Sequence, residues 1–117
     1  MGPSGQRKIV IKGIAPPAAG KVIQVDADGQ SVAVFNVGGN LLAIDSVCTH
    51  LGGPLDEGAV EEHRVECPWH GSVFDLETGR VLRGPAERPV RAYRAYMDTE
   101  GLVLEPRDLG SGVPAGH

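Results

Sequence analysis

Two short segments of the chain combine cysteine with histidine. The first reads Cys48-Thr49-His50, and the second reads Cys67-Pro68-Trp69-His70. The spacing is C-x-H, then sixteen residues, then C-x-x-H, and it uses both cysteines of the chain. Thiolate sulfur suits iron–sulfur clusters or zinc, and imidazole nitrogen suits several metals. The pattern therefore predicts a metal centre, with Cys48, His50, Cys67 and His70 as its ligands.

Two loops that each carry one cysteine and one histidine can face each other in a simple way. Both sulfurs then lie on one side and both imidazoles lie on the other. This arrangement fits a two-iron cluster in which one iron takes the cysteines and the other takes the histidines. With both irons ferric, the irons, sulfides and thiolates of such a centre sum to zero charge, whereas the four-cysteine version carries two negative charges. An electron is added more easily to the neutral centre, so its reduction potential is higher.

Zinc is the alternative metal. Two cysteines and two histidines can make a tetrahedral zinc site. Zinc knuckles usually pair two cysteines at C-x₂₋₄-C spacing, however, and the chain has no such pair. A zinc enzyme also needs a general base, and no clear candidate is present. A zinc-binding structural module is therefore the less favoured hypothesis.

The residues around the four candidate ligands make the pattern more specific. Residues 48–55 read CTHLGGPL and residues 67–75 read CPWHGSVFD, which resemble the two cluster-binding loops of the Rieske [2Fe–2S] family. Residues 83–86 and Pro89 resemble the proline loop that covers the cluster in that family. The resemblance spans about residues 41–93. It implies one [2Fe–2S] cluster held by two thiolates and two histidine Nδ1 atoms, on stacked antiparallel sheets with a small cluster-binding subdomain.

The sequence also departs from part of that family. Rieske proteins of respiratory and photosynthetic complexes carry an extra cysteine in each loop, and Gly53 and Trp69 stand at those places here. They commonly have a tyrosine where this chain has Phe74, which has no hydrogen-bond donor; Ser72 is kept. With fewer donors to the cluster, we expect a potential in the lower part of the Rieske range of about −150 to +300 mV. These differences argue against a subunit of a respiratory complex.

The resemblance is closest to short ferredoxin components of oxygenase systems. It implies an electron carrier, not an enzyme, that takes one electron from a flavin-dependent NAD(P)H reductase and gives it to a terminal oxygenase. Docking is expected to be transient and to use the His50/His70 edge. The small subunit of an NAD(P)H nitrite reductase, which has a similar length and fold, is the alternative partner assignment.

Short runs of alternating apolar and polar residues predict the elements that carry these loops. Val, Ile, Tyr and Phe dominate the runs and favour half-buried strands. Turns are predicted where Gly, Asn or Asp separate two runs, at 28–29, 38–40 and 100–101, and also at 77–79. Strands this short suggest an all-β fold. The predicted strands are Lys8–Ile14, Lys21–Val25, Ser31–Val37, Leu41–Asp45, Val90–Met97 and Leu102–Glu105.

Residues 46–89 interrupt this pattern. They are dense in Gly, Pro, His and Cys. We expect them to form a cluster-binding subdomain in which ligand loops replace regular strands, inside a single domain that spans residues 1–117. Residues 106–117 are rich in Gly, Pro and Ser and are predicted to form a loose C-terminal tail.

Composition limits the remaining function classes. The net charge is −4 and no block of Lys or Arg is present, which argues against a nucleic-acid surface. No apolar run approaches the roughly 20 residues that cross a bilayer. The opening residues MGPSGQRK lack the apolar stretch of a signal peptide, so a cytoplasmic location is expected, without membrane attachment.

Overall fold

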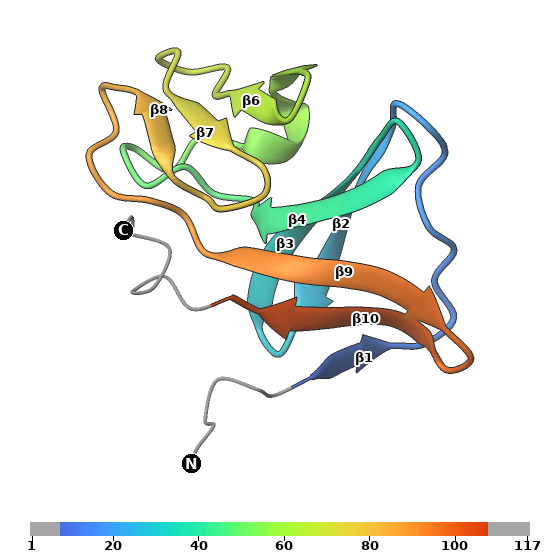
Figure 1. Ribbon diagram of the computed structural model, residues 1–117. Helices are drawn as coiled ribbons and strands as arrows, with labels where there is room; N and C mark the ends of the chain where they lie inside the picture. The colour runs from blue at the N-terminus through green and yellow to red at the C-terminus, as the bar shows by residue number, and fades with distance from the viewer. Residues whose placement is uncertain (1–7, 108–117) are drawn as a thin grey trace.

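The computed structural model describes residues 8–107 and shows an all-β chain built from two antiparallel sheets (Figure 1). The larger sheet has six strands in the order β1-β10-β9-β4-β3-β2, and the smaller has four in the order β5-β6-β7-β8. The predicted all-β class with stacked antiparallel sheets is confirmed. The larger sheet comprises β1 (Ile9–Ile11), β2 (Val22–Ala27), β3 (Gln30–Val37), β4 (Asn40–Asp45), β9 (Ala92–Asp98) and β10 (Gly101–Pro106). The smaller sheet comprises β5 (Ala59–Glu61), β6 (Arg64–Glu66), β7 (Val73–Asp75) and β8 (Val81–Arg83), preceded by a 3₁₀ turn η1 (Leu55–Glu57).

Two tight turns set the register of β2, β3 and β4. Asp28 and Gly29 have φ angles of 60° and 87°, and Gly38 and Gly39 have φ angles of 62° and 94°. Positive φ at both central residues gives the turn twist that matches antiparallel strands. The hairpins close with Ala27 opposite Gln30 and with Val37 opposite Asn40. These two turns lie where the sequence predicts them.

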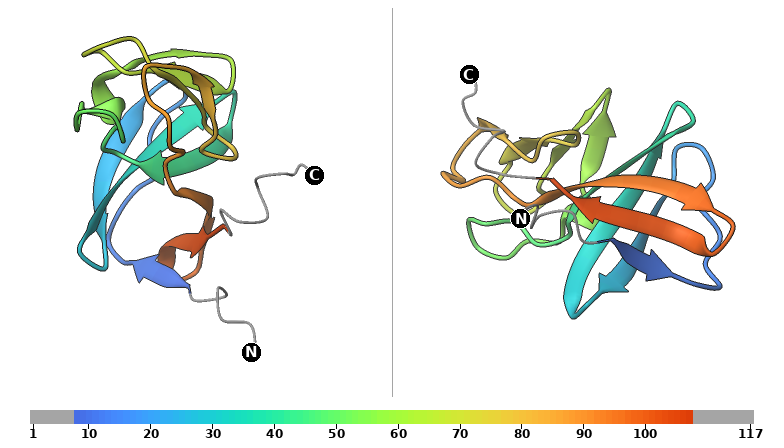
Figure 2. Two further views of the ribbon diagram at one scale, coloured as in Figure 1. Left: turned by 90° about the vertical axis from the view of Figure 1, so that its left-hand side faces the viewer. Right: turned by 60° about the horizontal axis from the view of Figure 1, so that its bottom comes forward.

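Strand β3 is buried on both of its faces. Val32 and Val34 point into one core, which they share with residues of β2, β9 and β10. Ala33 and Phe35 point into a second core, which also contains Cys48 and Cys67. The alternation predicts a half-buried strand. Strand β3 is instead buried on both faces, because the smaller sheet covers the second face (Figure 2).

The smaller sheet corrects one expectation from the sequence. Residues 46–89 were expected to have loops in place of regular strands, but they contain four strands of three residues each. Cys67 and His70 lie on the connection between β6 and β7, and Cys48 and His50 lie on the segment between β4 and β5. The start predicted for the loose C-terminal tail, residue 106, is also too early in the chain. Pro106 still pairs with Tyr93 in the larger sheet, and the backbone N–H of Arg107 donates to Ala92 O at 2.9 Å. Residues 108–117 lie outside the described residues.

No helix long and apolar enough to cross a membrane occurs between residues 8 and 107. The four-stranded sheet and its connections lie at one end of the larger sheet, as Figures 1 and 2 show. The buried residues of the second core join the two sheets, so the larger sheet is the base on which the candidate metal loops rest.

A hydrogen bond between two strands of the larger sheet has a titratable carboxyl group as its acceptor. The hydroxyl of Tyr93 in β9 donates to Asp45 Oδ1 at the end of β4, at 2.7 Å. Burial raises the pKa of the Asp45 carboxyl above its usual 3.8, and the Tyr93 hydrogen bond and the charge of Arg91 offset part of this rise. The native state therefore holds this proton more tightly than the unfolded chain does.

We expect Asp45→Asn to change how stability depends on pH. Because the folded pKa of Asp45 is raised, its ionisation lowers the free energy of unfolding as pH rises above about 3.8, until pH exceeds the folded pKa. Asparagine keeps an acceptor oxygen for Tyr93 but does not titrate. The stability of the wild type relative to the variant should fall across that window and then level off, as measured by urea unfolding at a series of pH values. A difference that rises with pH would contradict the assignment.

Candidate metal centre

The two candidate ligand loops have the same backbone turn, although their sequences differ. In the first, Cys48 N–H donates to Gly53 O at 2.8 Å and Gly52 N–H donates back to Cys48 O at 2.9 Å. In the second, Cys67 N–H donates to Ser72 O at 2.7 Å, and the residue four positions after the cysteine again donates to the cysteine carbonyl, at 3.1 Å. That fourth residue is glycine in both loops, with φ of 81° in each. Glycine meets the positive φ without steric cost, so each loop folds back on its own cysteine.

In the structure the four predicted ligands form two pairs, one of cysteines and one of histidines. Cys48 and Cys67 are each 3% exposed, neither forms a disulfide, and their thiols lie close enough to interact. His50 and His70 are exposed, with ring centroids 5.2 Å apart and ring planes at 84°. The sulfur pair therefore lies inside and the imidazole pair lies at the surface, which is the division that the sequence predicts.

Glycine is needed at position 53 because the two loops approach each other there. A Cβ atom at Gly53 would lie 2.6 Å from Cys67 Sγ and 3.2 Å from Trp69 Cγ. Position 53 is thus in direct contact with the opposite loop. Gly53 stands where Rieske proteins of respiratory complexes carry a cysteine. The structure shows that the small size of Gly53 allows the two ligand loops to approach each other closely.

Burial raises the pKa of the Cys48 thiol, and the neighbouring Cys67 adds to the rise. The backbone N–H groups of His50 and Leu51 act in the opposite direction, and that of His50 lies 3.4 Å from Cys48 Sγ. A buried thiol ionises readily only beside a compensating positive charge. Iron supplies such a charge, and thiolate is its ligand form.

The segment 84–89 is bonded to both ligand loops. Thr49 Oγ1 donates to Arg88 O at 2.6 Å, and Ala86 N–H donates to the buried Ser72 Oγ at 2.9 Å. Thr49 stands between two ligand candidates, and Ser72 follows the second loop directly. This segment, which resembles a proline loop in sequence, therefore restrains both loops at once.

The surface beside the two histidines is apolar. Leu51 and Trp69, each next to a histidine in the chain, are 57% and 55% exposed. The indole of Trp69 lies at the surface, against Gly53. An exposed apolar rim of this kind suits contact with another protein.

Two residues near the site were missed as functional candidates. Arg83 donates from Nε and Nη2 to Gly71 O, at 3.2 and 3.0 Å, and its Nη2 lies 3.3 Å from Glu66 Oε2. Arg83 belongs to β8 and Glu66 to β6, next to Cys67. No sequence pattern relates the two positions, because only the pairing of the short strands brings them together.

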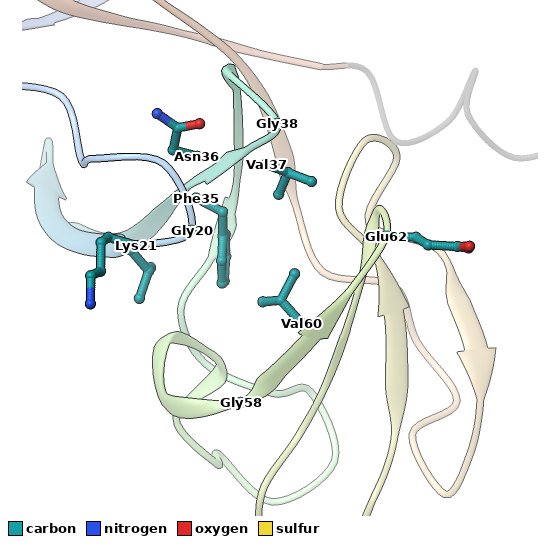
Figure 3. Close-up of a pocket in the computed structure, with 10 residues that line it drawn as sticks. Gly20, Lys21, Phe35, Asn36, Val37, Gly38, Gly58, Val60 and Glu62 are labelled. Carbon is teal, nitrogen blue, oxygen red and sulfur yellow. The ribbon is translucent and has the colours of Figure 1, made fainter.

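A groove of about 400 Å³ lies elsewhere, between the two sheets. Phe35, Val37 and Val60 form its apolar part, with Lys21 and Glu62 at its rim, and the side chains of Val37 and Val60 converge across it (Figure 3). None of the four candidate ligands lines this groove.

The donor set and its shape fit a two-iron cluster. Two thiols are buried together and two imidazoles lie together at the surface, an arrangement that would offer each iron of such a cluster a pair of like ligands. Among residues 8–107, no three His, Cys, Asp or Glu side chains gather closely enough to hold one metal ion.

Comparison with known proteins agrees with this geometry. The family model for the Rieske [2Fe–2S] domain matches residues 10–94. The ferredoxin component of the naphthalene 1,2-dioxygenase system of Pseudomonas putida is 34% identical over 86 residues, which cover 74% of this chain and 83% of the relative. The 3-phenylpropionate/cinnamic acid dioxygenase ferredoxin subunit of Escherichia coli K12 is 35% identical over 93 residues, covering 79% and 87%.

Solved structures give the same result. The ferredoxin of carbazole 1,9a-dioxygenase from Nocardioides aromaticivorans IC177 has a TM-score of 0.70 at 31% identity, covering 85% of this chain and 96% of that one. A chain from a complex of reduced oxygenase and oxidized ferredoxin in carbazole 1,9a-dioxygenase has a TM-score of 0.72 at 25% identity, covering 86% and 94%. These relatives support the oxygenase-type ferredoxin over the nitrite reductase subunit and the zinc module. The chain therefore belongs to the Rieske [2Fe–2S] family and is a ferredoxin with one [2Fe–2S] cluster.

Proposed function

We propose that Cys48 and Cys67 ligate one iron of the cluster and that His50 and His70 ligate the other. The main support for this proposal is the matched pair of turns, which places two thiols together in the core and two imidazoles together at the surface. When bound, the cluster takes up one electron and gives it back without making or breaking a bond.

The exposed histidine pair is the point at which the electron enters and leaves. An imidazole that ligates iron with one ring atom and reaches the surface with the rest shortens the distance to a partner. Leu51 and Trp69 flank this edge with apolar surface, which favours contact without a strong charge requirement. Interfaces of redox partners are usually small, below about 1,200 Å², and exchange quickly.

The relatives support an oxygenase as one partner. One similar chain comes from a complex of an oxygenase with a ferredoxin, and other relatives are ferredoxin components of dioxygenase systems. We therefore assign this chain as the electron carrier, and not the enzyme, between a flavin-dependent NAD(P)H reductase and a terminal oxygenase. Buried thiols that must stay reduced for iron binding fit a cytoplasmic location.

The ligand assignment is tested by replacing each ligand in turn. Cys48→Ser, His50→Ala, Cys67→Ser and His70→Ala should each abolish the EPR signal of the anaerobically prepared, dithionite-reduced protein, and iron and sulfide content should fall with it. His63→Ala is the matched control, because His63 is exposed and lies outside both loops. A single variant that keeps a wild-type signal would remove that residue from the ligand set.

The same preparation tests the carrier role. A redox titration followed by EPR should show a one-electron midpoint in the lower part of the Rieske range. The reduced protein should then pass its electron to a ring-hydroxylating oxygenase and be reduced again by a flavin-dependent NAD(P)H reductase. Reoxidation by a nitrite reductase but not by an oxygenase would overturn the partner assignment and leave the cluster assignment intact.

A further inference from the structure

A charged pair lies directly against the second ligand loop. The guanidinium of Arg83 donates twice to the carbonyl oxygen of Gly71, the residue that follows His70. The same guanidinium is 3.3 Å from Glu66 Oε2, and Glu66 precedes Cys67. One positive and one negative side chain thus stand at the two ends of the loop that carries Cys67 and His70.

The position of the Gly71 carbonyl explains why Arg83 is useful there. Gly71 has a φ of 81°, and its N–H is used to close the loop on Cys67 O. Its carbonyl oxygen accepts two hydrogen bonds from Arg83, which lies twelve residues later on β8. A planar guanidinium with several donors is suited to this double contact, and lysine offers only a point charge.

The pair is too exposed to be explained as a source of stability. The side chains of Arg83 and Glu66 are 62% and 51% exposed, and ion pairs of this kind contribute little to folding. Their charges nevertheless act over several ångströms on any centre held by the loop between them. A reduced cluster carries one more negative charge than an oxidised one, so a nearby positive charge favours reduction and a nearby negative charge opposes it.

We propose that Arg83 and Glu66 tune the reduction potential of the cluster in opposite directions, Arg83 upward and Glu66 downward. The inference rests on the ligand assignment proposed above. Arg83 is also a positioning residue, since it fixes the carbonyl after His70 and with it the loop that orients that imidazole.

Four variants separate an effect of charge on the reduction potential from an effect of loop structure. Arg83→Gln, Glu66→Gln and the double variant remove one or both charges, and Arg83→Lys keeps the charge but loses the double hydrogen bond. Midpoint potentials are measured by EPR-monitored titration at low and at high salt. We expect a downward shift for Arg83→Gln, an upward shift for Glu66→Gln, and a value between the two for the double variant. Arg83→Lys should stay nearer the wild type than Arg83→Gln, and all shifts should shrink at high salt because exposed charges are screened.

A purely structural role gives a different result. If the pair only braced the loop, Arg83→Gln and Glu66→Gln would loosen the same contact and shift the potential in the same direction. Equal signs, or potentials that do not move, would therefore overturn the proposal. Should Arg83→Gln lose its cluster, the sign for Glu66→Gln still decides, because that variant keeps the bonds between Arg83 and Gly71. Wild-type protein without a cluster signal would instead overturn the proposed function and this inference with it.

Discussion

A chain with Gly53→Ala is expected to fold but to retain little iron. The added Cβ would lie 2.6 Å from Cys67 Sγ, a separation that such atoms do not tolerate, and 3.2 Å from the Trp69 ring. The cysteine or the whole second loop must then move. Because metal ligands tolerate displacements of only about 0.2 Å, we expect roughly 10- to 100-fold weaker retention of the metal, the range seen when ligand orientation is disturbed.

Iron and sulfide per chain, measured after anaerobic reconstitution and desalting, check this expectation. Met97→Ala is the control, since Met97 is 38% exposed on β9 and lies outside both ligand loops and outside segment 84–89. The far-ultraviolet circular dichroism of both variants should match that of the wild type, because Gly53 lies outside both sheets. Wild-type iron content in Gly53→Ala would show that the two loops do not need this close approach.

Phe74→Ala is expected to cause the largest loss of stability. Phe74 lies on β7, is completely buried, and belongs to the core that also contains Leu55, Cys48 and Cys67. Removing a buried phenylalanine side chain costs about 3–5 kcal/mol, from lost burial and from the cavity left behind. Since this core joins the two sheets, the loss falls on the base of the metal loops as well as on the sheet.

Urea unfolding of the cluster-loaded protein under anaerobic conditions measures the effect. Val60→Ala, on β5 of the same smaller sheet, is the matched control: Val60 is 43% exposed, so its truncation should change the unfolding free energy by about 0.5 kcal/mol or less. Phe74→Leu should lie between the two, because it keeps much of the buried volume. A cost below about 1 kcal/mol for Phe74→Ala would mean that the core can close over the gap.

The larger sheet could be predicted from sequence because its signals are local. Asp28-Gly29 and Gly38-Gly39 supply the positive φ angles of two hairpins, and the alternating runs around them give the strands. The double burial of β3 was not predicted, because alternation reports which residues share a face and not what covers each face. That cover is the smaller sheet, whose presence depends on pairing between distant segments.

The smaller sheet itself had no clear sequence signal. Its strands are three residues long, and all three residues of β5 are exposed, so no alternation marks them. The four ligand candidates were predicted because their residue types and spacing carry chemistry independently of the strands. Arg83 and Glu66 were missed because their meeting requires β8 and β6 to lie on either side of β7, which no local pattern specifies.

The segment 84–89 is attached to one ligand loop through Thr49 and to the other through Ser72. This one segment therefore contacts both halves of the site. Because the same segment holds both loops, we expect a change that breaks these hydrogen bonds to loosen the thiol pair and the imidazole pair together. We therefore expect the rate of iron loss to depend on a stretch of chain that contains none of the four proposed ligands.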